Sequence, residues 1–122
     1  MSVETQQAGA VDVVEVTVAG ELDAAAVPGV RTMLYEALAG QPGVIVVDLA
    51  TCPVIDAAGI ALLLDVHRRA WMADGRLFLR SPTPQVQRVL EIARVAHILP
   101  VAPEVPGAGV TDTVAKAAAS AS

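Results

Sequence analysis

A continuous apolar run at residues 44–47 most constrains the fold of this 122-residue chain. Such a run is typical of a central strand covered on both faces, whereas a strand with one wet face alternates apolar and polar residues. A β-branched run with partial alternation occupies residues 11–18, and a helical pattern lies between the two runs. A strand, a helix and a second strand in this order predict a right-handed βαβ unit.

The helical pattern has Pro28 in its first turn and one apolar face, made of Val30, Met33, Leu34, Ala37 and Leu38. A second helix is expected from an N-cap at Asp56 to about Ala73. Its inward positions are expected to be Ile60, Leu63, Leu64, His67 and Trp71. We expect His67 to be a packed, half-buried side chain and not a ligand.

The remaining segments complete an α/β chain. A weak strand is expected near residues 3–7, joined by a hairpin at residues 8–10 to the strand that follows. A further strand is expected at residues 76–80, then a helix with the stripe Val86, Val89, Leu90 and Ala93. We therefore predict a mixed β-sheet of four to five strands, with helices packed mainly on one face, in one domain at residues 1–101. Residues 102–122 are expected to form a Pro/Gly-rich linker, then an Ala-rich C-terminal helix at about 110–119 or a tail.

Charge and composition exclude several classes of function. The formal net charge is -5, and Arg31 is the only base among residues 1–65, which carry nine acids. An acidic patch repels nucleic acid and anionic membranes and favours a protein partner with a basic surface, although the same acids can simply keep a domain soluble. Only three residues are aromatic, namely Tyr35, Trp71 and Phe78, which does not suit stacking on bases or sugars.

The sequence offers no catalytic or metal-binding pattern. Cys52 is the only cysteine, so no internal disulfide forms, and we expect it to pack as a small hydrophobe. No His or Cys spacing indicates a metal, and no nucleophile and base accompany Asp48 or Asp56, so we expect neither a cofactor nor an enzyme. We see no signal peptide and no membrane span, and we expect a soluble, cytoplasmic protein.

The junction at residues 54–60, Val-Ile-Asp-Ala-Ala-Gly-Ile, joins a strand and a short loop to an apolar helix. Polar residues that accept phosphate often sit at such a corner, because free backbone N–H groups and the positive end of the helix dipole attract anions there. Ala57 and Ala58 have no hydroxyl group. This corner therefore has no side-chain hydroxyl that could accept a phosphate.

Five short motifs follow one another along the chain. They are Gly20-Glu21-Leu22-Asp23, Val44-Ile45-Val46-Val47-Asp48-Leu49, Ile55-Asp56-Ala57-Ala58-Gly59-Ile60, Gly75-Arg76-Leu77 and Ser81-Pro82-Thr83-Pro84-Gln85-Val86. Taken together, these motifs resemble the STAS domain family, named for sulfate transporters and anti-sigma factor antagonists. The resemblance covers residues 10–101 and is greatest to stand-alone bacterial antagonists.

The resemblance implies partner switching. In this family an antagonist binds a kinase-type anti-sigma factor, frees the sigma factor, and is turned off when the kinase phosphorylates a serine after the corner aspartate. That position is Ala57 here, and a methyl group cannot accept the roughly -2 charge of a phosphate. The resemblance thus implies a constitutive antagonist, monomeric or weakly dimeric. The alternatives are an adaptor subunit of a membrane transport ATPase and a STAS scaffold component.

The predicted partner-binding residues lie in the two loops and along one face of the second helix. They are Glu21, Leu22, Asp23, Asp56, Ala57, Ala58, Gly59, Leu62 and Asp65. Leu62 is predicted either as an exposed contact or as a half-buried residue against the neighbouring helix. Asp23 and Asp56 are each compatible with a capping role as well.

Overall fold

The computed structural model describes residues 5–8, 11–102 and 115–118. Its centre is a parallel sheet of β2 (Val11–Ala19), β3 (Val44–Asp48) and β4 (Arg76–Arg80), in that spatial order. Helix α1 (Val27–Ala39) connects β2 to β3, and α2 (Ala57–Met72) connects β3 to β4. The predicted βαβ units and the α/β class are confirmed.

Two short strands pair with β2. β1 (Thr5–Ala8) is antiparallel to its first half, and β5 (Ala115–Ala118) is parallel to residues 16–19. The C-terminal helix predicted over residues 110–119 is therefore wrong at residues 115–118, and its other residues lie outside the described part of the chain. Alanine favours a helix by well under 1 kcal/mol per residue, and the unpaired edge of β2 offers hydrogen bonds that outweigh this preference.

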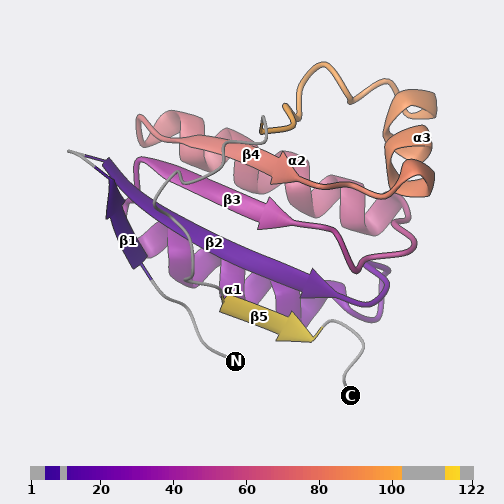
Figure 1. The fold of residues 1–122 in the computed structure, drawn as a ribbon, viewed down its shortest axis with the longest axis horizontal. Coiled ribbons are helices and arrows are strands. Elements are labelled where there is room, and N and C mark those ends of the chain that lie inside the picture. Colours follow the sequence, from indigo (N-terminus) through magenta and orange to yellow (C-terminus); the bar gives the residue numbers. More distant parts are fainter. Residues whose placement is uncertain (1–4, 9–10, 103–114, 119–122) are drawn as a thin grey trace.

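Helices α1 and α2 cover one face of the sheet, and α3 (Pro84–Ile92) lies beyond the carboxyl end of β4 (Figure 1). The sheet contributes every second side chain to the core between these layers, as expected for the two-residue period of a strand. These strand residues are Val14, Val16, Val18, Ile45, Val47, Leu77 and Leu79. Val46 is also buried, so the prediction of a central strand at residues 44–47 is confirmed.

The buried face of α2 differs from the predicted one. Leu62, Val66 and Ala70 are buried, whereas His67 is half-buried and the side chain of Trp71 is 56% exposed. The prediction that Trp71 faces inward is therefore wrong, whereas His67 is half-buried as expected. Helix α2 packs against α1 as well as against β4, so its buried face is rotated toward α1. Apolar residues of α2 occur on most sides of the helix. Their spacing therefore predicts a helix but does not show which side is buried.

The segment after α3 returns to β4. Thr83 caps α3, since its Oγ1 accepts a hydrogen bond from the Val86 N–H at 3.2 Å. Leu79 donates its N–H to the carbonyl of Pro100 at 2.8 Å, and Ala102 donates to the carbonyl of Leu79 at 2.7 Å. This return positions residues 98–102 beside the sheet and brings Ile98 against α2.

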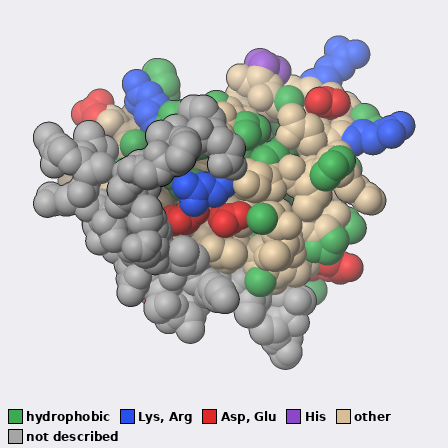
Figure 2. Space-filling view, in the orientation of Figure 1, with side chains coloured by type: hydrophobic (Ala, Val, Ile, Leu, Met, Phe, Trp, Pro, Cys, Tyr) green, Lys and Arg blue, Asp and Glu red, His purple; other side chains and the backbone are tan. Residues whose placement is uncertain are grey.

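The opposite face of the sheet carries polar side chains. Glu15 is buried and forms an ion pair with Arg80, while the buried Thr17 hydroxyl has no hydrogen-bond partner among the described residues. Burial raises the pKa of Glu15, against the lowering effect of Arg80. Figure 2 looks onto this face and shows acidic and basic side chains side by side near its middle. No helix in the described residues is long and apolar enough to cross a bilayer.

Candidate functional site

The two loops predicted to carry the site meet at the carboxyl ends of β2 and β3. Leu22 forms a parallel bridge with Ile55, donates its N–H to the Val54 carbonyl at 2.9 Å, and accepts from the Asp56 N–H at 3.2 Å. Residues 21–24 and 54–59 therefore form one continuous surface, which we call the α2 corner. The sequence predicted that both loops lie at one sheet edge, and the structure confirms it.

Asp56 holds the α2 corner together through both carboxylate oxygens. Oδ1 accepts from the Gly59 N–H at 3.0 Å, which is the predicted N-cap of α2. Oδ2 accepts from the Ala24 N–H at 3.2 Å, in the other loop. The capping role is confirmed, and the second contact was not predicted. Asp56 is thus a positioning residue, because its acceptor atoms are engaged inside the corner.

Gly59 allows the two loops to approach each other. A Cβ placed on this residue would lie 2.5 Å from the Leu22 carbonyl oxygen, 2.8 Å from Leu22 Cγ and 2.9 Å from Ile55 Cγ1. Real Cβ atoms essentially never show contacts this short, and all three of these atoms belong to buried residues. The corner therefore requires glycine for its close packing and not for an unusual backbone angle.

The exposed part of the α2 corner is small and acidic. Ala57, Ala24, Val54 and Glu21 are exposed, and Asp23 and Ala58 are half-buried. The Asp23 Oδ1 accepts from the Ala26 N–H at 3.0 Å, so it caps the turn that leads into α1. A partner approaching this corner would meet methyl groups bordered by carboxylates.

Leu22, Gly59 and Leu62 do not belong to that exposed surface. Leu22 is fully buried and Gly59 is buried beneath it, so both shape the corner from inside. Leu62 is only 3% exposed, in the seam between α2 and α1, where it lies near Val27. The prediction of an exposed Leu62 contact is therefore wrong, because the rotation of α2 toward α1 covers this side chain.

Asp65 lies one turn further along α2 and bonds α2 to α1. The Tyr35 hydroxyl donates to its Oδ2 at 2.5 Å, and the Arg69 Nε donates to both carboxylate oxygens at 3.0 Å. Arg69 also stacks over the Tyr35 ring, 4.7 Å from its centroid. These hydrogen bonds, that of Tyr35 above all, lower the pKa of Asp65. Its partners Tyr35 and Arg69 were missed, although the spacing of Asp65 and Arg69 is that of a helical ion pair.

The structure also bears on two other kinds of chemistry, thiol reactivity and metal binding. Cys52 is fully buried, and burial raises the pKa of its thiol, which confirms a packing role. Over the residues that the structure describes, no three His, Cys, Asp or Glu side chains gather as a metal site requires.

Replacing Asp56 with alanine should lower the free energy of unfolding by about 1–2 kcal/mol, because the cap and the bond to Ala24 are both lost. Asp56→Asn should lose less than half of this amount, since the amide oxygen still caps α2 but an NH2 group faces Ala24. Urea denaturation of the wild type and the two variants measures the three free energies of unfolding. Equal losses in the two variants would show that the charge, and not the hydrogen-bond geometry, is what matters.

Comparison with known proteins identifies the family. The model of the STAS domain matches residues 2–108. The anti-sigma factor antagonist SpoIIAA in its unphosphorylated form is similar in structure, with a TM-score of 0.62 and 24% identity over 84% of this chain and 90% of that one. The phosphorylated Bacillus cell fate determinant SpoIIAA gives a TM-score of 0.57 and 23% identity, over 84% and 93% of the two chains.

An anti-sigma factor antagonist from Mycobacterium paratuberculosis is 19% identical, with a TM-score of 0.68 over 91% of this chain and 94% of that one. A search of curated proteins found no match. At these identities the solved structures establish a shared fold, and the domain match extends over most of the residues described above. The chain is a member of the STAS domain family.

Proposed function

We propose that this chain is a non-enzymatic anti-sigma factor antagonist, which binds a kinase-type anti-sigma factor through the α2 corner and so frees a sigma factor. The observation that carries the proposal is the exposure of Ala57 at a corner where Asp56 and Gly59 bring two loops together. The proposal is also supported by the roles given for similar structures, since SpoIIAA and the mycobacterial protein are anti-sigma factor antagonists.

The corner suits a protein partner for physical reasons. Exposed methyl groups cost little to desolvate, and a backbone held by internal hydrogen bonds loses little entropy on binding. Glu21 and Asp23 border this apolar centre and favour a basic partner surface by charge complementarity. Small side chains at the centre let the partner approach the backbone closely.

Ala57 removes the phosphorylation switch from this proposal. SpoIIAA has been solved in phosphorylated and unphosphorylated forms, so that protein is modified. The resemblance described above puts the acceptor hydroxyl at the position of Ala57, which has none. Binding by this chain should therefore continue in the presence of ATP. Thr51 and Ser81 are the exposed hydroxyl residues at the ends of β3 and β4, and a phosphate found on either would mark a different switch.

Displacement of the sigma factor tests the proposal. The candidate partner is an anti-sigma factor with a kinase-type ATP-binding domain, encoded beside this chain or co-purified with it. Added to a preformed complex of that protein with its sigma factor, this chain should release free sigma factor in size-exclusion chromatography. Stable persistence of the original complex at excess antagonist would contradict the proposal.

A further inference from the structure

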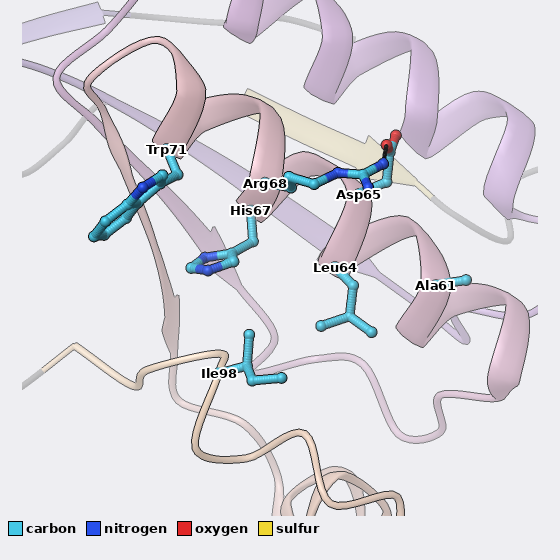
Figure 3. A pocket seen from close by; sticks show the side chains of 7 residues that line it. All are labelled: Ala61, Leu64, Asp65, His67, Arg68, Trp71 and Ile98. Carbon is cyan, nitrogen blue, oxygen red and sulfur yellow. Dashed lines mark ion pairs between the residues drawn. The ribbon is translucent and has the colours of Figure 1, made fainter.

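A shallow apolar groove runs along the outward side of α2, beyond the α2 corner. Figure 3 shows Leu64, His67 and Trp71 projecting from one side of the helix, with Ile98 facing them from the segment after α3. The hollow has a volume of about 650 Å³, and most of its lining is apolar. Trp71 is 56% exposed and Ile98 is 37% exposed, so this apolar surface faces solvent in the isolated chain.

The groove is bordered by positive charge. Arg68 lines it, and Arg76 stacks on the Trp71 ring with its guanidinium 4.0 Å from the ring centroid. The side chain of Arg68 is 73% exposed. Among the described residues of the lining, Asp65 is the only carboxylate; it accepts hydrogen bonds from Tyr35 and Arg69 and lies 3.7 Å from the Arg68 guanidinium. The border is therefore basic on a chain whose net charge is -5.

We propose that this groove, which we call the Trp71 groove, binds an acidic amphipathic segment of a protein partner. Large apolar side chains of that segment would fill the space between Leu64, Trp71 and Ile98. Its carboxylates would pair with Arg68 in the lining and with Arg76 beside Trp71, and guanidinium groups pair well with carboxylates. An amphipathic helix in an apolar groove uses side chains spaced by three or four residues, which matches the spacing of the lining residues along α2.

Two other occupants fit less well. An anionic membrane would be repelled by the overall charge of -5, and a flat surface would not fill a hollow. A second copy could offer its acidic α2 corner, but the exposed centre of that corner is made of alanine side chains, with Val54 the only large apolar residue there, 37% exposed. Methyl groups of this size leave most of the groove empty.

The Trp71 groove is separate from the α2 corner. Ala57 and Trp71 are fourteen positions apart on α2, which is roughly 21 Å at 1.5 Å per residue. The border of the corner is acidic and that of the groove is basic, so the two surfaces select partners of opposite charge. The inference therefore does not depend on the proposed antagonist function, and each can fail alone.

Peptide display on the full chain tests the inference directly. Selected peptides should be rich in Asp and Glu, with large apolar residues at helical spacing. Trp71 is the only tryptophan of the chain, so binding of a synthetic selected peptide should shift its fluorescence emission to shorter wavelength. The same peptide with each acidic residue replaced by lysine should bind at least about tenfold more weakly, a loss of 1.4 kcal/mol or more.

Matched variants test whether the acidic peptide binds at the Trp71 groove. Arg68→Glu should weaken the acidic peptide at least about tenfold. Arg88→Glu, at an exposed arginine on α3, should leave its affinity within about threefold, and so should Ala57→Asp. Selection of basic peptides, failure to select any binder, or equal affinity for wild type and Arg68→Glu would overturn the inference. A Trp71 shift caused by anionic phosphatidylglycerol vesicles, or by self-association on concentrating the chain, would equally overturn it in favour of a membrane or a second copy.

Discussion

Gly59→Ala should lower the free energy of unfolding by about 2–3 kcal/mol and abolish binding of the anti-sigma factor, the largest combined effect we expect. The added methyl group would lie 2.5 Å from the Leu22 carbonyl oxygen. Relief of this contact requires the two loops to separate, which breaks the bond from the Asp56 N–H to Leu22. Urea denaturation measures the first effect and isothermal titration calorimetry the second.

Gly29→Ala is the matched control. Gly29 also lies in the first turn of a helix, α1, and a Cβ there meets nothing within 4 Å. Alanine is the better helix former, so this variant should be as stable as wild type or more stable by about 0.5–1 kcal/mol. Similar losses in both variants would show that the effect of Gly59→Ala does not arise from close packing at the corner.

Ala57→Asp should weaken binding of the anti-sigma factor about 100-fold, close to 2.7 kcal/mol, because an unpaired carboxylate would be buried in the interface. Folding should be unaffected, since a negative charge in the first turn of α2 is favourable to the helix dipole. Calorimetry gives the affinity, and circular dichroism with thermal melting gives the stability. Ala57→Ser is the control of similar size without charge and, in the absence of ATP, should bind within about threefold of wild type.

Unchanged affinity of Ala57→Asp would place the interface away from the α2 corner. A loss of binding accompanied by a lower melting temperature would point instead to damaged folding. The two readouts together therefore separate a docking role of Ala57 from a structural one.

The sequence was sufficient for the α/β class and for the residues that begin and end most elements. Continuous or alternating apolar runs predicted β2, β3 and β4, and the N-cap at Asp56 predicted the start of α2. These features are local, because a strand period or a helix cap depends on neighbouring residues. For the same reason the two loops could be expected at one edge of the sheet, since parallel strands end together.

The orientation of α2 could not be predicted from the sequence. Ala, Leu and Val occur on most sides of this helix, so the choice between Trp71 and Ala70 as the buried residue depends on packing against α1. That single rotation buries Leu62 and exposes Trp71. The bond from Asp56 to Ala24 and the return of Ile98 to α2 also join residues distant in sequence, and no local pattern indicates such contacts.

The central claim is that this corner binds an anti-sigma factor and carries no phosphate switch at Ala57. Its most direct test incubates the chain with the cognate anti-sigma factor and ATP, then records the intact mass and the affinity of the recovered chain. We predict no added phosphate and an unchanged dissociation constant, while Ala57→Ser gains one phosphate and loses binding. Phosphate on the wild-type chain together with lost affinity would contradict the claim.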